Sequence, residues 1–178
     1  MPGTAQLALS DRLAARGFVE ADPEFGMVLD LARDRPVVTG DVMVVGDDTG
    51  VDAFLGVMAA AYDWPDDGRS STWAELYRRA DVGLDHTIRH VVVREAGRPL
   101  ACASLFGAGG HAFVTNVGTV PSARGRGLGT QATLAVLDLA ARAGARQATL
   151  TASAMGRGVY ARIGFREDAL LRRWISPG

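Results

Sequence analysis

Lysine is absent from this chain, and all 19 of its basic residues are arginine. A Walker-type phosphate loop needs a lysine that reaches the β- and γ-phosphates, so the sequence excludes nucleotide hydrolysis by that route. Cysteine occurs once, as Cys102, which excludes an intramolecular disulfide and a multi-cysteine metal site, and we expect no bound metal. This cysteine content is typical of a cytoplasmic protein. Cys102 has no charged neighbour, which predicts a small buried side chain rather than a reactive thiol.

Net charge is nearly absent as well, at −1 for 178 residues. No overall basic field would therefore draw the chain onto nucleic acid or an anionic membrane, and we expect neither as a partner. The first ten residues have neither a basic region nor a continuous apolar run, so they do not resemble an export signal. The uncharged run from Pro99 to Ala123 is interrupted by glycines and by Pro121, which predicts strands and turns rather than a membrane-spanning helix.

The length predicts one domain, and the patterns from Asp41 onward predict one mixed α/β layer. Residues 41–178 are the expected domain, and residues 1–40 stand apart as an N-terminal extension. Strand patterns are expected at 42–45, 89–94, 100–106, 112–120, 147–152 and 170–175, and helices at 51–62, 72–80, 128–143 and 158–163.

A weak internal sequence similarity suggests a possible origin of residues 1–40. Residues 13–20, Leu-Ala-Ala-Arg-Gly-Phe-Val-Glu, match residues 160–167, Tyr-Ala-Arg-Ile-Gly-Phe-Arg-Glu, and a strand-like run follows each segment. Residues 1–40 are therefore either a degenerate remnant of a second copy of the fold or unrelated chain that matches by chance in an Ala/Arg-rich sequence.

The strongest chemical signal is the turn Arg124-Gly125-Arg126-Gly127-Leu128-Gly129, which lies between a predicted strand and a predicted helix. Backbone N–H groups at a helix N-terminus bind anions, and glycines let phosphate oxygens approach the backbone closely. A diphosphate is the ligand that this turn predicts. The third glycine of a dinucleotide fingerprint would fall at Thr130, so a Rossmann site is disfavoured. The remaining alternatives are a solvated surface loop and an RNA-binding segment, and the neutral net charge argues against RNA.

Two motifs in this sequence resemble the signatures of the GCN5-related N-acetyltransferase (GNAT) family. The first is Thr119-Val120-Pro121-Ser122-Ala123 followed by R-x-x-G-x-G, and the second is Tyr160 followed by Gly164-Phe165. They stand in the family's order, and the resemblance covers about residues 41–175. It implies an α/β fold with a central mixed, mostly antiparallel sheet, splayed central strands, and helices on both faces. It also implies acetyl-CoA, or another acyl-CoA, as the cofactor.

The resemblance further implies where the cofactor lies. The pantetheine arm would enter a cleft between strands 112–120 and 147–152, and backbone N–H groups of the turn would hold the pyrophosphate. Gly118 within its strand independently suggests a bulge. Ser153 stands where many members have asparagine, and it is either a cofactor contact or an N-cap. The cofactor-binding residues that we expect are Val117, Thr119, Val120, Arg124, Gly125, Arg126, Gly127, Leu128, Gly129, Thr130 and Ser153.

Transfer to an amine requires oxyanion stabilisation and a proton for the departing thiolate. Tyr160 is the candidate general acid, since a phenol of pKa about 10 can protonate a thiolate whose acid has a pKa of about 8.5; the alternative is a packed core aromatic. A main-chain N–H near Gly118 is the candidate oxyanion donor. Phe113 and Thr115 occupy positions where some members have a catalytic glutamate. His111 is a weak candidate for the base, and a water relay or a neutral amine would serve equally well.

The acceptor site is predicted near an aromatic and acidic segment that contains Trp64, Asp66 and Trp73. Such a segment suits a cationic amine with an apolar body, although acidic loops are usually solvated and tryptophans usually pack between helices. The sequence thus predicts an N-acyltransferase that moves acetyl from acetyl-CoA to a primary amine of a small molecule or peptide in a ternary complex. The alternative is a non-catalytic acyl-CoA-binding module. The chain is expected to be a monomer or a homodimer.

Overall fold

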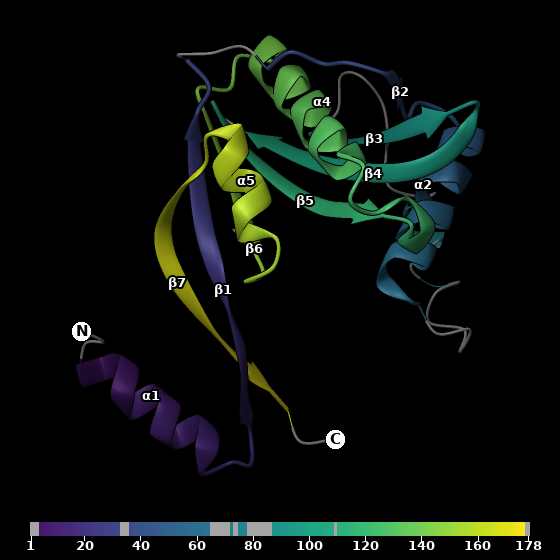
Figure 1. Cartoon of the computed structure of the whole chain (residues 1–178). Helices are drawn as coiled ribbons and strands as arrows, with labels where there is room; N and C mark the ends of the chain where they lie inside the picture. Colours follow the sequence, from purple (N-terminus) through teal and green to yellow (C-terminus); the bar gives the residue numbers. More distant parts are fainter. Residues whose placement is uncertain are drawn as a thin grey trace.

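The computed structural model describes residues 4–32, 36–64, 72, 75–77, 87–108 and 110–176 (Figure 1). The described part of the chain forms a seven-stranded sheet in the order β2-β3-β4-β5-β6-β1-β7. Among the described strands only the β5–β6 pair is parallel, so the predicted mixed, mostly antiparallel α/β fold is confirmed. The strands are β1 (Val19–Asp30), β2 (Asp41–Val44), β3 (Ile88–Glu95), β4 (Arg98–Ala108), β5 (His111–Thr119), β6 (Gln147–Ala152) and β7 (Arg166–Ile175). The helices are α1 (Thr4–Ala14), α2 (Asp48–Tyr62), α4 (Leu128–Arg142), α5 (Arg157–Ile163) and the short 3₁₀ turn η1 (Pro121–Ala123).

The side chains of the β3–β4 hairpin point alternately to the two faces of the sheet and contribute to a hydrophobic core on each face. Val91 and Val93 point into a cluster that α4 covers, whereas Val92 and Cys102 point into a second cluster that α2 covers. Side chains of neighbouring strand residues point to opposite faces, so one run of apolar residues serves both cores. Helices therefore lie on both faces of the sheet, as predicted. None of the helices in the described ranges is long and apolar enough to cross a membrane.

The parallel pair β5–β6 is short and leaves a gap. It extends only from His111 and Gln147 to Val114 and Leu150. Beyond Val114, β5 remains paired with β4 while its other edge separates from β6. The predicted splay between residues 112–120 and 147–152 is therefore present, and it leaves an unpaired strand edge inside the molecule.

The first forty residues do not all stand apart from the sheet. β1 lies between β6 and β7, and residues from Phe25 to Asp30 pair with β6 while residues from Val19 to Val28 pair with β7. The predicted boundary at residue 40 therefore does not separate the sheet from the extension. No local pattern indicates that β1 inserts here, because both of its partner strands follow it by more than 100 residues.

The outer ends of β1 and β7 form a two-stranded ribbon that extends away from the rest of the sheet, and α1 lies at its far end (Figure 1). Arg172 of β7 ties this ribbon to the helix. Its guanidinium donates to both carboxylate oxygens of Glu20, at 2.6 and 2.7 Å, and to the Ser10 hydroxyl at 2.8 Å. Arg172 thus links α1 to both strands of the ribbon by polar contacts.

Candidate active site

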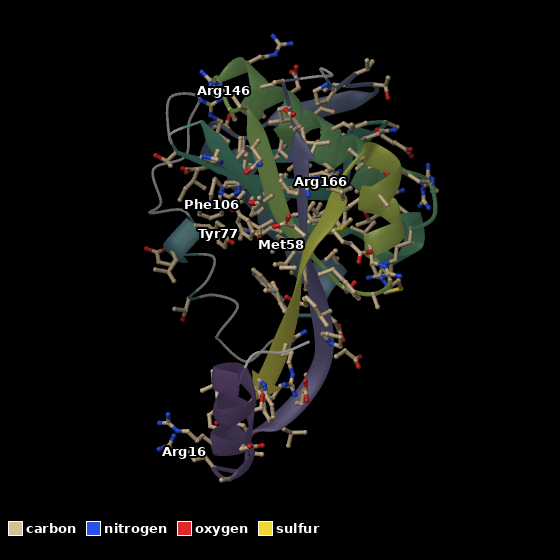
Figure 2. All side chains as sticks on the ribbon, turned by 90° about the vertical axis from the view of Figure 1, so that its left-hand side faces the viewer. Arg16, Met58, Tyr77, Phe106, Arg146 and Arg166 are labelled. Carbon is tan, nitrogen blue, oxygen red and sulfur yellow. The ribbon has the colours of Figure 1, made fainter. Side chains whose placement is uncertain are left out.

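A cavity of about 450 Å³ opens where β5 separates from β6. Its walls come from α2, from the described residues that follow α2, from both strands and from α5. Met58 and Tyr77, which are labelled in Figure 2, both line it and belong to the apolar cluster that α2 covers. The lining residues are Met58, Tyr62, Trp64, Tyr77, Val114, Thr115, Asn116, Val117, Thr151 and Tyr160.

A β-bulge in β5 shapes the floor of this cavity. Between the pairs Cys102–Gly118 and Ser104–Thr115, β5 contains one residue more than β4. Asn116 adopts a left-handed conformation there, with φ of 52°. An asparagine tolerates this region better than most residues do. The bulge predicted from Gly118 is thus present two residues earlier, and Asn116 was missed because its conformation depends on tertiary contacts.

Those contacts form a polar chain beneath the cavity. The Asn116 side-chain amide donates to the Tyr77 hydroxyl at 2.9 Å and to Ser104 Oγ at 3.1 Å. Ser104 Oγ lies 2.7 Å from Nδ1 of the buried His90. Burial lowers the pKa of His90 to about 4, so the imidazole is neutral at pH 7. Hydrogen bonds among these uncharged side chains therefore hold the bulge in place.

The main chain of β5 beyond the bulge is partly occupied by protein. The Tyr62 hydroxyl donates to the carbonyl oxygen of Val117 at 3.0 Å, and burial raises the pKa of Tyr62 to about 12. The N–H of Val120 donates to the carbonyl of Leu100 at 2.9 Å. The carbonyl of Thr119 accepts from Arg124 Nε at 3.3 Å. The cofactor contacts expected at Val117, Thr119 and Val120 remain predictions. Only the main-chain N–H and C=O groups of these residues that do not form the hydrogen bonds above could make such contacts.

Gly118 has a packing reason as well as its predicted catalytic one. A Cβ at this position would lie 2.9 Å from the Ala61 Cβ and 3.3 Å from the Tyr62 ring. The end of α2 can therefore approach β5 only because residue 118 has no side chain. Its role as a backbone oxyanion donor remains a prediction. Cys102 lies on the neighbouring strand, fully buried, and burial raises the pKa of its thiol to about 12, as expected for an unreactive cysteine.

The Arg/Gly turn presents a run of free backbone donors. Gly125 and Gly127 have φ of 77° and 79°, and α4 begins after Gly127 without a side-chain cap. The first hydrogen bond of the helix joins the N–H of Gln131 to the carbonyl of Gly127. Within the described ranges, the six N–H groups from Gly125 to Thr130 have no protein acceptor, and a Cβ at Gly125 or Gly127 would meet no atom within 4 Å. This geometry suits an anion with several oxygens.

The two arginines of the turn are already engaged by the protein. Arg124 donates from Nη2 to the carbonyl of Ala61 at 3.0 Å, in addition to its bond with Thr119, so its side chain ties the turn to α2 and β5. Arg126 forms an ion pair with Glu95 on the β3–β4 hairpin. Their expected role in cofactor binding remains a prediction. The backbone N–H groups of the turn, by contrast, have no acceptor among the described residues.

Tyr160 lines the cavity from α5, opposite β5. Its ring packs edge-on against Phe165 with centroids 6.0 Å apart, and burial raises the pKa of its hydroxyl above the ordinary value. The phenol therefore keeps its proton at neutral pH. No hydrogen bond from this hydroxyl to another described residue is present, which leaves the proton available to a bound ligand. The second signature residue and the Arg/Gly turn are thus brought to the same splayed region.

The remaining predicted site residues have different positions relative to the cavity. Ser153 Oγ accepts from the N–H of Gly156 at 3.1 Å, which is a turn-capping role ahead of α5. Trp64 lines the cavity and packs against the α2 cluster. Asp66 and Trp73 lie outside the described residues. His111 does not line the cavity, and six residues of β5 place it about 20 Å from Val117, so the structure does not support it as the base.

No described cluster of three or more His, Cys, Asp or Glu side chains could hold a metal ion. The lining residues that were not predicted as site residues are Met58, Tyr62, Tyr77, Val114, Thr115, Asn116 and Thr151. Tyr62 offered a signal, as an aromatic at the predicted end of a helix next to the acceptor segment. Met58 and Thr151 offered none, because their positions depend on how α2 and β6 pack against β5.

The chain was compared with models of protein families, with curated proteins and with solved structures. The model of the acetyltransferase (GNAT) family matches residues 58–165, which is more than half of the chain. No curated protein matches the chain in sequence. Among solved structures, a GCN5-related N-acetyltransferase from Kribbella flavida is 22% identical, with a TM-score of 0.70, over 96% of this chain and 64% of that one.

Two further structures are similar in fold. A putative GNAT acetyltransferase from Novosphingobium aromaticivorans is 24% identical, with a TM-score of 0.60, over 88% of this chain and 65% of that one. AAC(6')-Iy, solved with the bisubstrate analogue CoA-S-monomethyl-acetylneamine, is 18% identical, with a TM-score of 0.58, over 72% of this chain and 92% of that one. The chain spans less than two thirds of the Kribbella and Novosphingobium proteins. With both signature motifs at one splayed pair of strands, and with the family model matching across them, the chain belongs to the acetyltransferase (GNAT) family.

Proposed function

We propose that this chain is an N-acetyltransferase that moves the acetyl group of acetyl-CoA to a primary amine of a small molecule or peptide, in a ternary complex. The observation that carries the proposal is the run of six free N–H groups from Gly125 to Thr130 beside the splayed strands. A diphosphate is the ligand class that such a helix N-terminus and glycine turn bind best. A cytoplasmic location, with Cys102 reduced, is part of the same proposal.

The residues present fit the cofactor. The turn would hold the pyrophosphate through backbone N–H groups, and the free edge of β5 beyond Val114 would pair with the amides of the pantetheine arm. When bound, acetyl-CoA supplies an acetyl group activated as a thioester. The cavity beyond the bulge then receives the acceptor between α2 and Tyr160.

Acetyl transfer forms an amide bond, breaks the thioester C–S bond, takes one proton from the amine and gives one to the sulfur. Tyr160 supplies the proton to sulfur, because its phenol is neutral and has no competing acceptor among the described residues. We assign stabilisation of the oxyanion to a main-chain N–H of the bulge near Gly118.

The amine loses its proton without a dedicated base. Among the described residues that line the cavity, no carboxylate or imidazole is present, and Thr115 stands on the strand where a glutamate would serve. An acceptor amine that binds in its neutral form, or one that passes its proton to water, is compatible with a cavity wall that has no carboxylate or imidazole among its described residues. The tyrosines at 62, 77 and 160, with Trp64, favour an acceptor with an apolar or aromatic body.

Replacement of Tyr160 by Phe tests the acid. We expect kcat to fall by about 10²- to 10⁴-fold, the usual contribution of general acid catalysis, while the Kd for acetyl-CoA stays within about twofold. Tyr77→Phe is the matched control, because it removes a hydroxyl from the same cavity wall, and it should change kcat by less than about tenfold. Thiol release, measured over an amine panel, gives kcat, and thermal shift gives the Kd. An unchanged kcat in Tyr160→Phe would remove Tyr160 from its role.

A second function is a non-catalytic acyl-CoA-binding module of the same fold. The observation that favours it is the lack of a carboxylate or imidazole among the described lining residues. It predicts stabilisation by acetyl-CoA of about 2.7 kcal/mol at a ligand concentration of about 100 times Kd, without thiol release for any amine. Thiol release with a single amine of the panel decides for the enzyme.

A further inference from the structure

One face of the sheet stays partly open next to the cavity. The cavity wall follows β5 back to Val114, and the preceding residue of the strand is Phe113. The Phe113 side chain is 40% exposed, and that of Phe106, its directly opposed partner on β4, is 38% exposed (Phe106 is labelled in Figure 2). On the opposite face, Leu105 and Val114 are 3% and 2% exposed in the core that α4 covers. Two phenylalanines therefore face solvent at the end of the cavity, and we call this pair the aromatic shelf.

The strand register puts the aromatic shelf on the side of the sheet that carries the cavity floor. Side chains two residues apart along a strand share a face of the sheet. Phe113 therefore shares its face with Thr115 of β5, which lines the cavity. On β6, the residue paired with Phe113 is Thr149, which shares its face with the cavity residue Thr151. The shelf thus continues the floor of the cavity along both strands.

The path from the cavity to the aromatic shelf offers no charge to a ligand. The described strand side chains along it are Ser104, Thr115, Thr149 and Thr151, none of which is ionisable. His111 lies beyond the shelf, at the outer end of β5. An ammonium or carboxylate group placed on the shelf would lose hydration without gaining a partner, whereas an apolar group would remove exposed phenylalanine surface from water. The shelf therefore suits an apolar group.

The distance from the reacting atoms to the aromatic shelf corresponds to an extended amine. Phe113 lies four residues before Val117, which is about 13 Å along a strand, and the bulge shortens this path. In the proposed reaction the amino group lies at the other end of the cavity, between α2 and Tyr160. An acceptor that reaches the shelf must therefore carry its apolar group at the far end of a spacer of about this length.

We propose that Phe106 and Phe113 bind the apolar end of the acceptor, so that the chain acts on primary amines in which an extended spacer separates the amino group from an aromatic group. The inference rests on the proposed acetyl transfer, because that reaction determines which end of the amine lies in the cavity. The occupant of the shelf is the acceptor rather than a separate partner, because the shelf is continuous with the cavity floor. Aromatic rings gain from edge-on or offset contact with each other beyond the area that they bury.

Selectivity between two amines of different length tests the aromatic shelf. Phenylethylamine keeps its ring inside the cavity, whereas phenylhexylamine, with its ring at the end of a longer spacer, reaches Phe113. The ratio of the KM for phenylhexylamine to the KM for phenylethylamine should rise about tenfold in Phe106→Ala/Phe113→Ala, because contact with two rings is lost for the longer amine. Leu171→Ala, on β7 with 39% exposure, is the matched control and should keep the wild-type ratio. The same ratio in both variants would overturn the proposal.

A change of charge provides a test that a merely structural role would not satisfy. Phe113→Asp places a carboxylate on the shelf, so the KM for phenylhexylamine should rise. The KM for diaminooctane, whose second ammonium group would lie at the shelf, should fall about two- to fivefold, the usual size of an exposed ion pair. Leu171→Asp is the control and should change neither KM. A fall in the KM for diaminooctane in both variants, or in neither, would contradict the assignment of Phe113.

Binding measured without turnover separates this inference from the proposed function. Calorimetry with phenylhexylamine and the complex of the chain with CoA, which has no acetyl group to transfer, gives a Kd for the amine. We expect this Kd to be about tenfold weaker in Phe106→Ala/Phe113→Ala than in Leu171→Ala. If the difference in Kd is present but no amine releases thiol from acetyl-CoA, the transferase activity is refuted and the shelf remains a binding site. Equal Kd values refute the shelf, whether or not acetyl transfer is observed.

Discussion

At the scale of single residues, the packing of α2 against β5 requires a residue without a side chain at position 118. A Cβ there would lie 2.9 Å from the Ala61 Cβ, so Gly118→Ala forces α2 away from β5. Overpacking of this kind costs about 1–3 kcal/mol, and we expect urea unfolding to show that loss. Gly107→Ala is the control: it also lies in a strand, its Cβ would meet nothing within 4 Å, and its stability should change by less than about 0.5 kcal/mol. Equal losses in the two variants would contradict the close approach of α2.

The same scale separates what was predictable from what was not. Gly125 and Gly127 were predicted to bind an anion because the strand, turn and helix that give them meaning are adjacent in sequence. Asn116 was not predicted, because its left-handed conformation depends on Ser104 and Tyr77, which lie 12 and 39 residues away. Sequence reasoning thus predicted the glycine turn and missed most of the residues that line the cavity, because the cavity is formed by packing between distant elements.

At the scale of elements, the bulge of β5 determines where the strand leaves the sheet and the cavity opens. Asn116→Gly and Asn116→Ala both remove the side-chain bonds to Ser104 and Tyr77, but only glycine adopts φ near 52° without strain. We therefore expect Asn116→Ala to be less stable than Asn116→Gly by about 1 kcal/mol, the reverse of the order in an ordinary strand. Denaturant unfolding of both variants measures the difference. An alanine variant as stable as the glycine variant would mean that residue 116 is not held in this conformation.

The elements from β2 to β7 were largely predictable, since each has its own periodicity and turn. β6 was predicted with its bounds, and α4 was predicted within one residue at its end. The position of β1 was not predictable, because it depends on hydrogen bonds to β6 and β7 rather than on a local pattern. The internal similarity seen in the sequence has a structural counterpart: α1 and α5 are each followed by a Gly-Phe pair and then by a strand of the same ribbon. Descent of residues 1–40 from a second copy remains a prediction.

At the scale of the whole molecule, His90 links the unfolding free energy of the chain to pH. It is 1% exposed, its ring contacts those of Phe54 and Tyr77, and Ser104 Oγ is its hydrogen-bonding partner. No charged group of the described chain is paired with it. Burial lowers its pKa from 6.5 to about 4, so the unfolded chain binds a proton between these values that the folded chain does not. Stability must therefore fall as pH falls through this window.

The size of this effect follows from the two pKa values. Between pH 7 and pH 5 the His90 contribution should decrease by about 2 kcal/mol, because each unit of pKa difference corresponds to about 1.4 kcal/mol once the unfolded imidazole is protonated. His90→Gln removes this titration and leaves the carboxylates unchanged, so the variant should lose less stability than the wild type over the same interval. Urea unfolding of both proteins at pH 7, 6 and 5 gives the difference in slope. Parallel slopes would show that the pKa of His90 is the same in the folded and the unfolded chain, which would contradict its burial as a neutral imidazole between α2 and the sheet.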